Sequence, residues 1–223
     1  MIKNISNLGD AAIYCNFGDQ VNKKINSEVI NYFNSIKNSK IQGIINLAPS
    51  YNKLVISFDL NITNYKKIVD EIKSIKIEDS NLITKKTINI PICCEDGFEL
   101  DLNNLKENLK LDKEEILNNF FKKEYFCYMN GFIAGMPFMG DIDLSLRTKR
   151  LKTPRVKVPK GSVGITEQFC NIYTFESPGG WNIIGKTPLQ IFNKENKITP
   201  SIINPGNLVK FVRISEKDFY DWK

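Results

Sequence analysis

The chain has 223 residues, of which 42% are hydrophobic and 25% are charged, so its composition is that of a globular protein long enough to bury a core. Its formal net charge of +6 is too small to indicate a nucleic-acid partner by itself. The chain contains no histidine, which excludes Ser-His-Asp and Cys-His catalysis, histidine general-base chemistry and every zinc site that uses histidine.

The cysteines favour a reduced protein without a metal centre. There are five, with no C-x-x-C pair among them: Cys15, Cys93, Cys94, Cys127 and Cys170. The odd number argues against a disulfide framework, so we expect thiols that pack as small apolar residues. The N-terminus lacks a signal-peptide pattern, and the uncharged stretch at 131–140 is well short of the ~20 apolar residues that span a bilayer. We therefore expect a cytoplasmic protein without membrane contact.

The N-terminal part alternates strand and helix patterns. Short apolar runs between turn residues predict strands at residues 2–8, 11–17, 44–48, 54–58 and 87–92. Apolar residues at helical spacing predict helices over residues 21–36 and 65–75. This succession predicts an antiparallel sheet with helices on one face, an α+β sandwich, and we assign it to a first domain at residues 1–85.

The second part begins with a helical connector and continues as short strands. Leucines line one face of a helix near residues 102–109, and Asp112 stands three residues before Glu115, the spacing of a helix N-cap. From Gly131 onward the chain holds seven of its nine prolines and nine of its thirteen glycines. Such frequent turn residues predict a small β-barrel, and we assign residues 86–223 to this second domain, with the helical connector at its start.

A basic run at residues 147–160 carries seven positive charges and no acidic residue. Only four of the 31 basic residues of the chain are arginines, and three of those four lie in this run. The planar guanidinium suits bidentate contacts with carboxylate or phosphate, so these arginines favour a site for a small anionic substrate. We predict Arg155, restrained by the preceding proline, as the first catalytic ligand and Arg150 as the second. On charge alone, the run is also typical of a solvated strand face.

Three glycine-rich segments, residues 131–140, 159–164 and 176–181, surround this run. Glycines let backbone N–H groups approach an anion closely, although none of these segments has the spacing of a P-loop or a dinucleotide site. Taken singly, they are also typical of barrel turns. Together they predict a pocket with two aromatic walls, and the residues expected to bind substrate are Gly135, Phe138, Gly161, Ser162, Glu176, Ser177, Gly179, Gly180 and Trp181.

Taken in order, five segments resemble one family: residues 131–140, 151–155, 158–165, 177–181 and 184–188. It is the family of the B-type subunits of the bacterial ATP-dependent 5-oxoprolinase, also described as kinase A inhibitor or allophanate hydrolase subunit 1, and found as a carboxyltransferase subdomain in urea carboxylases. The resemblance implies an N-terminal α+β domain followed by a cyclophilin-like β-barrel.

The same resemblance implies an activity and its partners. Such a protein would work with a sister barrel subunit, of the C type, and with a third 5-oxoprolinase subunit, of the A type. Together they would open the lactam of 5-oxo-L-proline to L-glutamate, with ATP bound at a site shared with a partner and with no metal held by this chain. Two alternatives remain: a regulatory protein that inhibits a sensor histidine kinase, and a carboxyltransferase subunit of the urea-amidolyase type.

The sequence departs from the family pattern at several positions where polar or turn residues are expected. These positions are Phe120, Ala134, Phe138, Phe169, Cys170 and Asn171. Since the departures remove polar groups around the expected pocket, they are compatible with a divergent paralogue that has an altered substrate.

Overall fold

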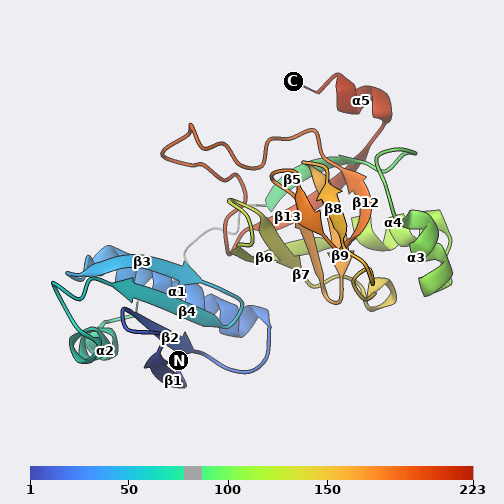
Figure 1. Cartoon of the computed structure of the whole chain (residues 1–223). Coiled ribbons are helices and arrows are strands. Elements are labelled where there is room, and N and C mark those ends of the chain that lie inside the picture. The colour runs from blue at the N-terminus through green and yellow to red at the C-terminus, as the bar shows by residue number, and fades with distance from the viewer. Residues whose placement is uncertain (78–86, 223) are drawn as a thin grey trace. The chain divides into compact units, whose positions relative to one another are not determined.

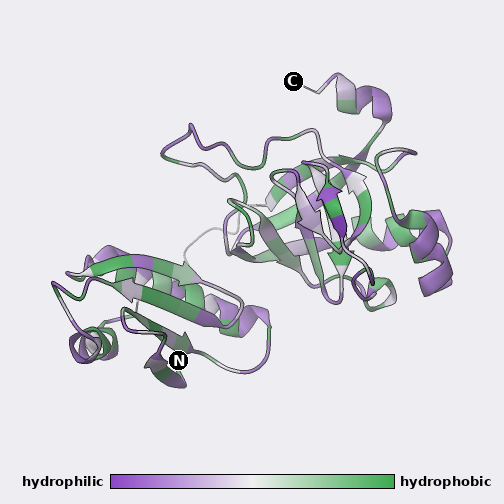
Figure 2. Cartoon of the chain, in the orientation of Figure 1, coloured by the Kyte–Doolittle hydropathy of each residue, from purple (hydrophilic) through white to green (hydrophobic). Residues whose placement is uncertain are grey.

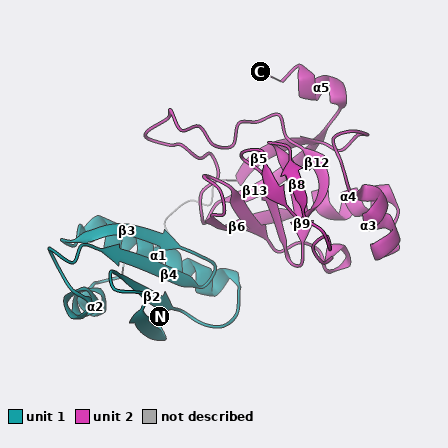
Figure 3. Cartoon of the chain, viewed as in Figure 1, with its two compact units in different colours: residues 1–84 teal, residues 85–223 magenta. Residues whose placement is uncertain are grey.

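The computed structural model describes residues 1–77 and 87–222, and the chain divides into two compact units, residues 1–84 and 85–223 (Figures 1 and 3). Each unit has its own hydrophobic core. Figure 2 shows hydrophobic residues along the strands of both units, while the helices carry one hydrophilic side. None of the helices in these residue ranges is long and apolar enough to cross a membrane.

The first unit is a four-stranded antiparallel sheet, in the order β1-β2-β4-β3, with helices packed on it. Its strands are β1 (Asn4–Asn7), β2 (Ala12–Asn16), β3 (Ile44–Pro49) and β4 (Lys53–Phe58). Its helices are α1 (Lys23–Ser39) and α2 (Tyr65–Ser74). Each helix begins after an asparagine, Asn22 or Asn64, whose side chain accepts a backbone N–H of the first turn. The elements therefore follow the predicted order closely, except that the strand predicted at residues 87–92 belongs to the barrel of the second unit.

The second unit is built around a closed barrel in the order β10-β7-β6-β13-β5-β12-β9. Its strands are β5 (Thr87–Cys93), β6 (Glu124–Asn130), β7 (Pro137–Gly140), β9 (Ser162–Thr166), β10 (Phe169–Ile172), β12 (Asn182–Lys186) and β13 (Leu208–Ile214). Strand β13 pairs with β5 in parallel, and the other pairings of the barrel are antiparallel. The predicted α+β fold with a β-barrel is confirmed.

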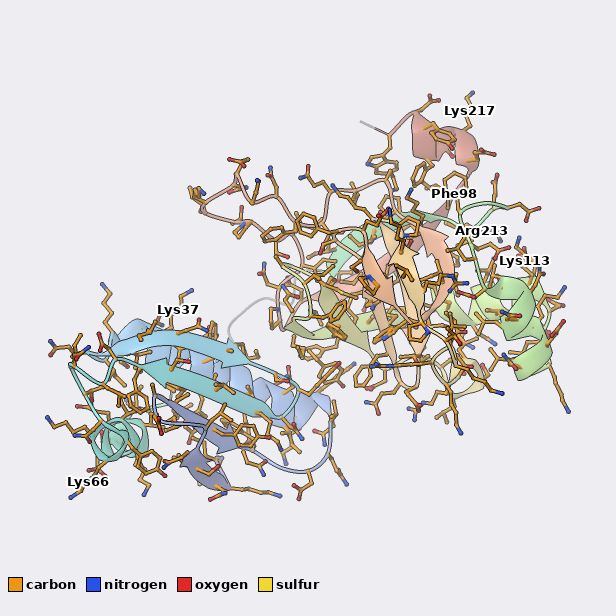
Figure 4. The ribbon with its side chains drawn as sticks, viewed as in Figure 1. Lys37, Lys66, Phe98, Lys113, Arg213 and Lys217 are labelled. Carbon is orange, nitrogen blue, oxygen red and sulfur yellow. The ribbon has the colours of Figure 1, made fainter. Side chains whose placement is uncertain are left out.

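Short elements complete this unit (Figure 1). They are α3 (Leu102–Leu109), α4 (Lys113–Phe121), a 3-10 turn (Leu144–Leu146), the two-stranded sheet of β8 (Arg155–Val158) with β11 (Ser177–Gly179), and α5 (Glu216–Tyr220). The predicted cap of α4 is confirmed, because Asp112 and Glu115 form a reciprocal capping box. In α5, Phe219 packs edge-on against Phe98, which Figure 4 labels, with ring centroids 4.7 Å apart.

The barrel interior is filled by alternate residues of its strands. Met139 of β7, together with Cys170 and Ile172 of β10, belongs to the main core cluster. Their neighbours Phe138 and Asn171 therefore face the outside of the barrel, because successive side chains of a strand point to opposite faces. All five cysteines are buried, as expected for thiols that pack as small apolar residues.

Candidate ligand pocket

A cavity of about 270 Å³ lies over the outer face of the barrel, in the second unit. It is lined by Phe132, Met136, Phe138, Arg150, Pro154, Tyr173, Pro178, Gly179, Gly180 and Trp181. Five of the residues predicted from the sequence meet there: Phe138, Arg150, Gly179, Gly180 and Trp181. The volume lies just below the range of ~300–1,000 Å³ typical of small-molecule sites, so the pocket suits a small metabolite.

The walls of the pocket are aromatic. Phe138 meets Trp181 edge-to-face, with ring centroids 5.5 Å apart and an interplanar angle of 79°. Phe132 lies on the rim with 68% of its surface exposed, whereas Trp181 is only 6% exposed. Two large rings in fixed edge-to-face contact make this part of the lining apolar and well ordered.

Tyr173 adds a residue with a hydroxyl group to this apolar lining. Burial raises the pKa of Tyr173 above its ordinary value. The phenol is therefore protonated at neutral pH and can donate a hydrogen bond. Gly179 makes room for it, since a Cβ atom at that position would lie 2.2 Å from the Tyr173 hydroxyl oxygen.

Arg150 is the charged residue of the pocket lining. Its guanidinium carbon lies 5.9 Å from the ring centroid of Trp181, within the range of a cation–π contact. The neighbouring Lys149 and Lys152 are also exposed. This cluster gives the pocket entrance a positive potential, which attracts anionic ligands.

Arg155, which the sequence predicted as the first catalytic ligand, does not line the pocket and pairs with a buried carboxylate instead. Its guanidinium makes a bidentate ion pair with Asp101, with nitrogen–oxygen distances of 3.0 and 2.7 Å. The Asp101 carboxylate is fully buried and also accepts the backbone N–H of Ile183 at 2.7 Å. The pair ties β8 to β12 and to the start of α3, so the geometry gives Arg155 a structural role. Its role as an anion ligand stays a prediction.

The expectation that Gly161 and Ser162 offer free backbone donors is not met. The Gly161 N–H donates to the Tyr173 carbonyl at 2.7 Å, and the Ser162 N–H donates to the Pro159 carbonyl at 3.2 Å. Gly161 has a positive φ of 85°, and a Cβ atom there would lie 2.6 Å from the Thr187 carbonyl oxygen. Glycine is therefore needed for a tight turn that enters β9 rather than for ligand contact.

The remaining predicted residues lie outside the pocket lining. Gly135, also at positive φ, packs against Phe192, whose ring would be 2.4 Å from an added Cβ atom. Glu176 is exposed and pairs with Lys157 at 3.2 Å. Ser177 is buried at the start of β11. These residues shape the surroundings of the pocket.

The departures from the family pattern affect the pocket less than the sequence predicted. Phe120 and Cys170 belong to the barrel core, where they cannot contact a ligand. Phe169 packs edge-on against Tyr128 with ring centroids 5.9 Å apart. The Ala134 carbonyl accepts the Thr174 hydroxyl at 2.7 Å, and the Asn171 side chain is fully buried. Of the six departures only Phe138 lines the pocket.

Sequence reasoning missed five lining residues: Phe132, Met136, Pro154, Tyr173 and Pro178. The signal for Tyr173 is its position directly after the strand that contains three of the departures. A larger open groove of about 820 Å³ lies beside α2 in the first unit, and it contains none of the predicted residues. Among residues 1–77 and 87–222, no group of acidic residues and cysteines is arranged to hold a metal ion.

An α+β unit joined to a closed barrel is the architecture of a carboxyltransferase-type domain. Residues 3–203 match the family described as carboxyltransferase domain, subdomain C and D, and the chain belongs to this family. It is 32% identical to the 5-oxoprolinase B subunit of Bacillus subtilis (strain 168), over 98% of this chain and 96% of that protein.

Two solved structures extend the comparison. A conserved uncharacterized protein from Pyrococcus horikoshii is 36% identical, with a TM-score of 0.58 over 97% of this chain and all of that chain (100%). The urea amidolyase of K. lactis has a TM-score of 0.77 at 17% identity, which shows the fold alone. That match covers 97% of this chain and 15% of the urea amidolyase, so the same fold also occurs as one part of a much longer protein.

Proposed function

We propose that the chain is one subunit of an ATP-dependent amide hydrolase complex that opens the lactam of 5-oxo-L-proline to L-glutamate. The observation that carries this proposal is a small aromatic pocket with one arginine and one buried phenol, in a chain that matches a 5-oxoprolinase B subunit over nearly its whole length. A barrel domain that also occurs inside a urea amidolyase is consistent with chemistry on amide-like carbonyl groups.

The lining fits a small ring that bears a carboxylate. Arg150 binds the carboxylate through its guanidinium, and Trp181 and Phe138 hold the flat ring. The Tyr173 hydroxyl donates to the amide oxygen, where negative charge develops as the carbonyl is attacked.

The glycine segment that was expected to cradle an anion offers no free N–H groups at Gly161 and Ser162 for a phosphate of ATP. The N–H groups of Gly161 and Ser162 are bonded within the protein, and the sequence has no P-loop. We therefore assign ATP to a site shared with a partner, and assign no phosphoryl-transfer step to this chain. The partners in this proposal are a sister barrel subunit of the C type and a third 5-oxoprolinase subunit of the A type.

The test is reconstitution. The chain is co-expressed with the two partner subunits, and glutamate release from 5-oxoproline is measured with and without ATP. Arg150→Ala is expected to lower kcat/KM by about 100-fold, mainly through KM, because a charge-assisted contact to the substrate is lost. Lys149→Ala is the matched control, since it removes an adjacent exposed charge that does not line the pocket. Equal activity of the Arg150 variant and the control would contradict the proposal.

A second candidate is a carboxyltransferase acting on urea-like substrates, which the family description and the urea amidolyase relatives favour. The same reconstituted complex distinguishes the two functions. Transfer of a carboxyl group from carboxybiotin to urea, without glutamate release from 5-oxoproline, would support the second candidate and exclude the first.

A further inference from the structure

Asn171 of β10 is a buried amide whose polar atoms have no partner. The residue has no exposed surface, and neither its Oδ1 nor its Nδ2 atom has a hydrogen-bond partner among the described residues. Asn182 of β12 is also buried, but its Nδ2 donates to the Lys149 carbonyl at 3.0 Å and to the Ile165 carbonyl at 3.4 Å. An amide that is buried without partners lowers stability, so such a group calls for a reason.

The Asn171 side chain lies directly behind the ligand pocket. In the barrel, Asn171 stands opposite Phe138 of β7 on one side and opposite Gly164 of β9 on the other, and Figure 1 labels these two strands. A Cβ atom added at Gly164 would lie 2.9 Å from the Asn171 Oδ1 atom and 3.0 Å from the Cβ atom of Trp181. The amide therefore adjoins Phe138 and Trp181, the two aromatic residues in contact in the pocket lining.

A ligand reaches this amide only if one of the adjoining rings turns. Trp181 is 6% exposed and is held on nearly all sides, whereas Phe138 is half-buried. An edge-to-face ring contact contributes less to stability than two buried polar atoms cost when they have no partner. A ligand that bonds to the Asn171 amide therefore offsets the loss of the ring contact, and Phe138 is the side chain that we expect to turn.

The amide edge of Asn171 has a specific chemical complement. Its Oδ1 accepts and its Nδ2 donates on the same side of the group, so the matching partner carries an N–H donor and a carbonyl acceptor side by side. A lactam has this arrangement, because its ring holds the N–H and the carbonyl group on one edge. A trans peptide bond does not, because its N–H and its carbonyl group point in opposite directions. An ester offers a carbonyl group but no N–H.

We infer that Asn171 is a specificity-determining residue that recognises the cis amide edge of the lactam substrate. Its Nδ2 donates to the lactam carbonyl oxygen, and its Oδ1 accepts the lactam N–H. The inference rests on the proposed function for the identity of the substrate. Since a carbonyl oxygen has two lone pairs, it accepts from Asn171 and from the Tyr173 hydroxyl together. Two donors stabilise the negative charge that develops on this oxygen better than Tyr173 does alone.

The test replaces one atom of the ligand and one side chain of the protein. Isothermal titration of the purified full-length chain compares 5-oxo-L-proline with the lactone of the same ring, 5-oxotetrahydrofuran-2-carboxylate, in which an oxygen replaces the N–H. The wild type is expected to bind the lactone at least about 30-fold more weakly, because Oδ1 then stays unpaired. Asn171→Leu keeps the branched shape without the polar atoms, and it is expected to bind the two ligands within about threefold of each other.

A stability measurement checks that the amide has no partner inside the protein. Asn182→Leu is the matched control, because it removes an amide that makes two hydrogen bonds. The control is expected to lower the thermal unfolding midpoint, whereas Asn171→Leu is expected to leave it unchanged or to raise it. Equal losses in the two variants would overturn the inference. The comparison of lactam with lactone in the wild type does not depend on how either variant folds.

The outcomes also separate this inference from the proposed function. If the wild type binds the two ligands equally well, or if Asn171→Leu keeps the preference for the lactam, the inference is overturned even in a complex that releases glutamate. Binding of neither ligand overturns it as well, since every residue of the inferred contact belongs to this chain. If the preference depends on Asn171 but the reconstituted complex releases no glutamate, the proposed function fails and the amide contact stands.

Discussion

Removal of the Arg155 guanidinium should destabilise the barrel unit strongly, and removal of the Arg213 guanidinium should not. Both arginines make bidentate pairs with a carboxylate: Arg155 with Asp101 at 3.0 and 2.7 Å, and Arg213 with Glu114 at 2.8 and 3.1 Å. The two pairs differ in burial. The Asp101 side chain has no exposed surface, whereas the side chains of Arg213 and Glu114 are 42% and 56% exposed. Figure 4 labels Arg213.

The magnitude follows from this difference. Arg155→Ala leaves the buried Asp101 charge with one remaining donor, the Ile183 N–H. Breaking a buried pair in this way costs about 3–5 kcal/mol, and we take about 3 kcal/mol because the Arg155 side chain is 28% exposed, so water reaches the site. The unfolding midpoint should fall by about 6–12 °C at roughly 2–4 °C per kcal/mol. Arg213→Ala should cost less than about 1 kcal/mol.

The assay is differential scanning calorimetry of both variants at pH 7, supported by urea unfolding. A double-mutant cycle with Asp101→Asn gives the coupling energy, because the neutral amide removes the uncompensated charge and should recover part of the lost stability. If the unfolding midpoints of Arg155→Ala and Arg213→Ala differ by less than about 2 °C, which corresponds to about 1 kcal/mol or less, the structural role of Arg155 is refuted. An Arg155 variant of normal stability that no longer binds substrate would support the anion-ligand role that the sequence predicted.

Two further predictions concern the pocket and the pH dependence of stability. Gly179→Ala should displace Tyr173 and weaken substrate binding, because the added Cβ atom would lie 2.2 Å from the Tyr173 hydroxyl oxygen. Gly180→Ala should be tolerated, since its Cβ atom would have its nearest neighbour at 3.5 Å. Isothermal titration with 5-oxoproline compares the two variants, and equal affinities would contradict the steric argument. Burial raises the pKa of Cys15 and Cys94 to about 12, so the folded thiols keep protons that the unfolded chain releases above about pH 9. Stability should fall as the pH rises from about 9 toward 12, and alanine at both positions should reduce that slope in urea unfolding.

Local features of the sequence were sufficient for most of the fold. Asp112 and Glu115 predict the start of α4 because a capping box needs only residues three positions apart. Helical spacing likewise predicts α1 and α2, since each helix is specified by its own apolar stripe. The closure of the barrel is different, because the parallel pairing of β5 with β13 joins segments more than a hundred residues apart. Turn composition indicated a barrel, but not which strands close it.

The pocket was predicted in part, and the errors have a physical pattern. Glycines were expected to serve a ligand, yet Gly161 and Gly135 serve the backbone and a neighbouring ring, because a positive φ and a close approach also require glycine. Gly179 does serve the pocket, through the space it leaves for the Tyr173 hydroxyl. A sequence shows that a position tolerates only a small residue, but not which atom occupies the space.

The choice between two arginines shows the same limit for charge. Their scarcity in a lysine-rich chain drew attention to both residues, but the guanidinium of Arg155 pairs with Asp101, which lies 54 positions earlier in the chain. Asp101 itself gave no signal, because a lone aspartate before a helix is usually a cap. No carboxylate lines the pocket around Arg150 in the described part of the chain, and the Arg150 guanidinium lies over the Trp181 ring. An internal ion pair and a ligand site therefore use the same side-chain chemistry. They differ in whether a buried carboxylate of the same chain lies within bonding distance of the guanidinium, as Asp101 does for Arg155.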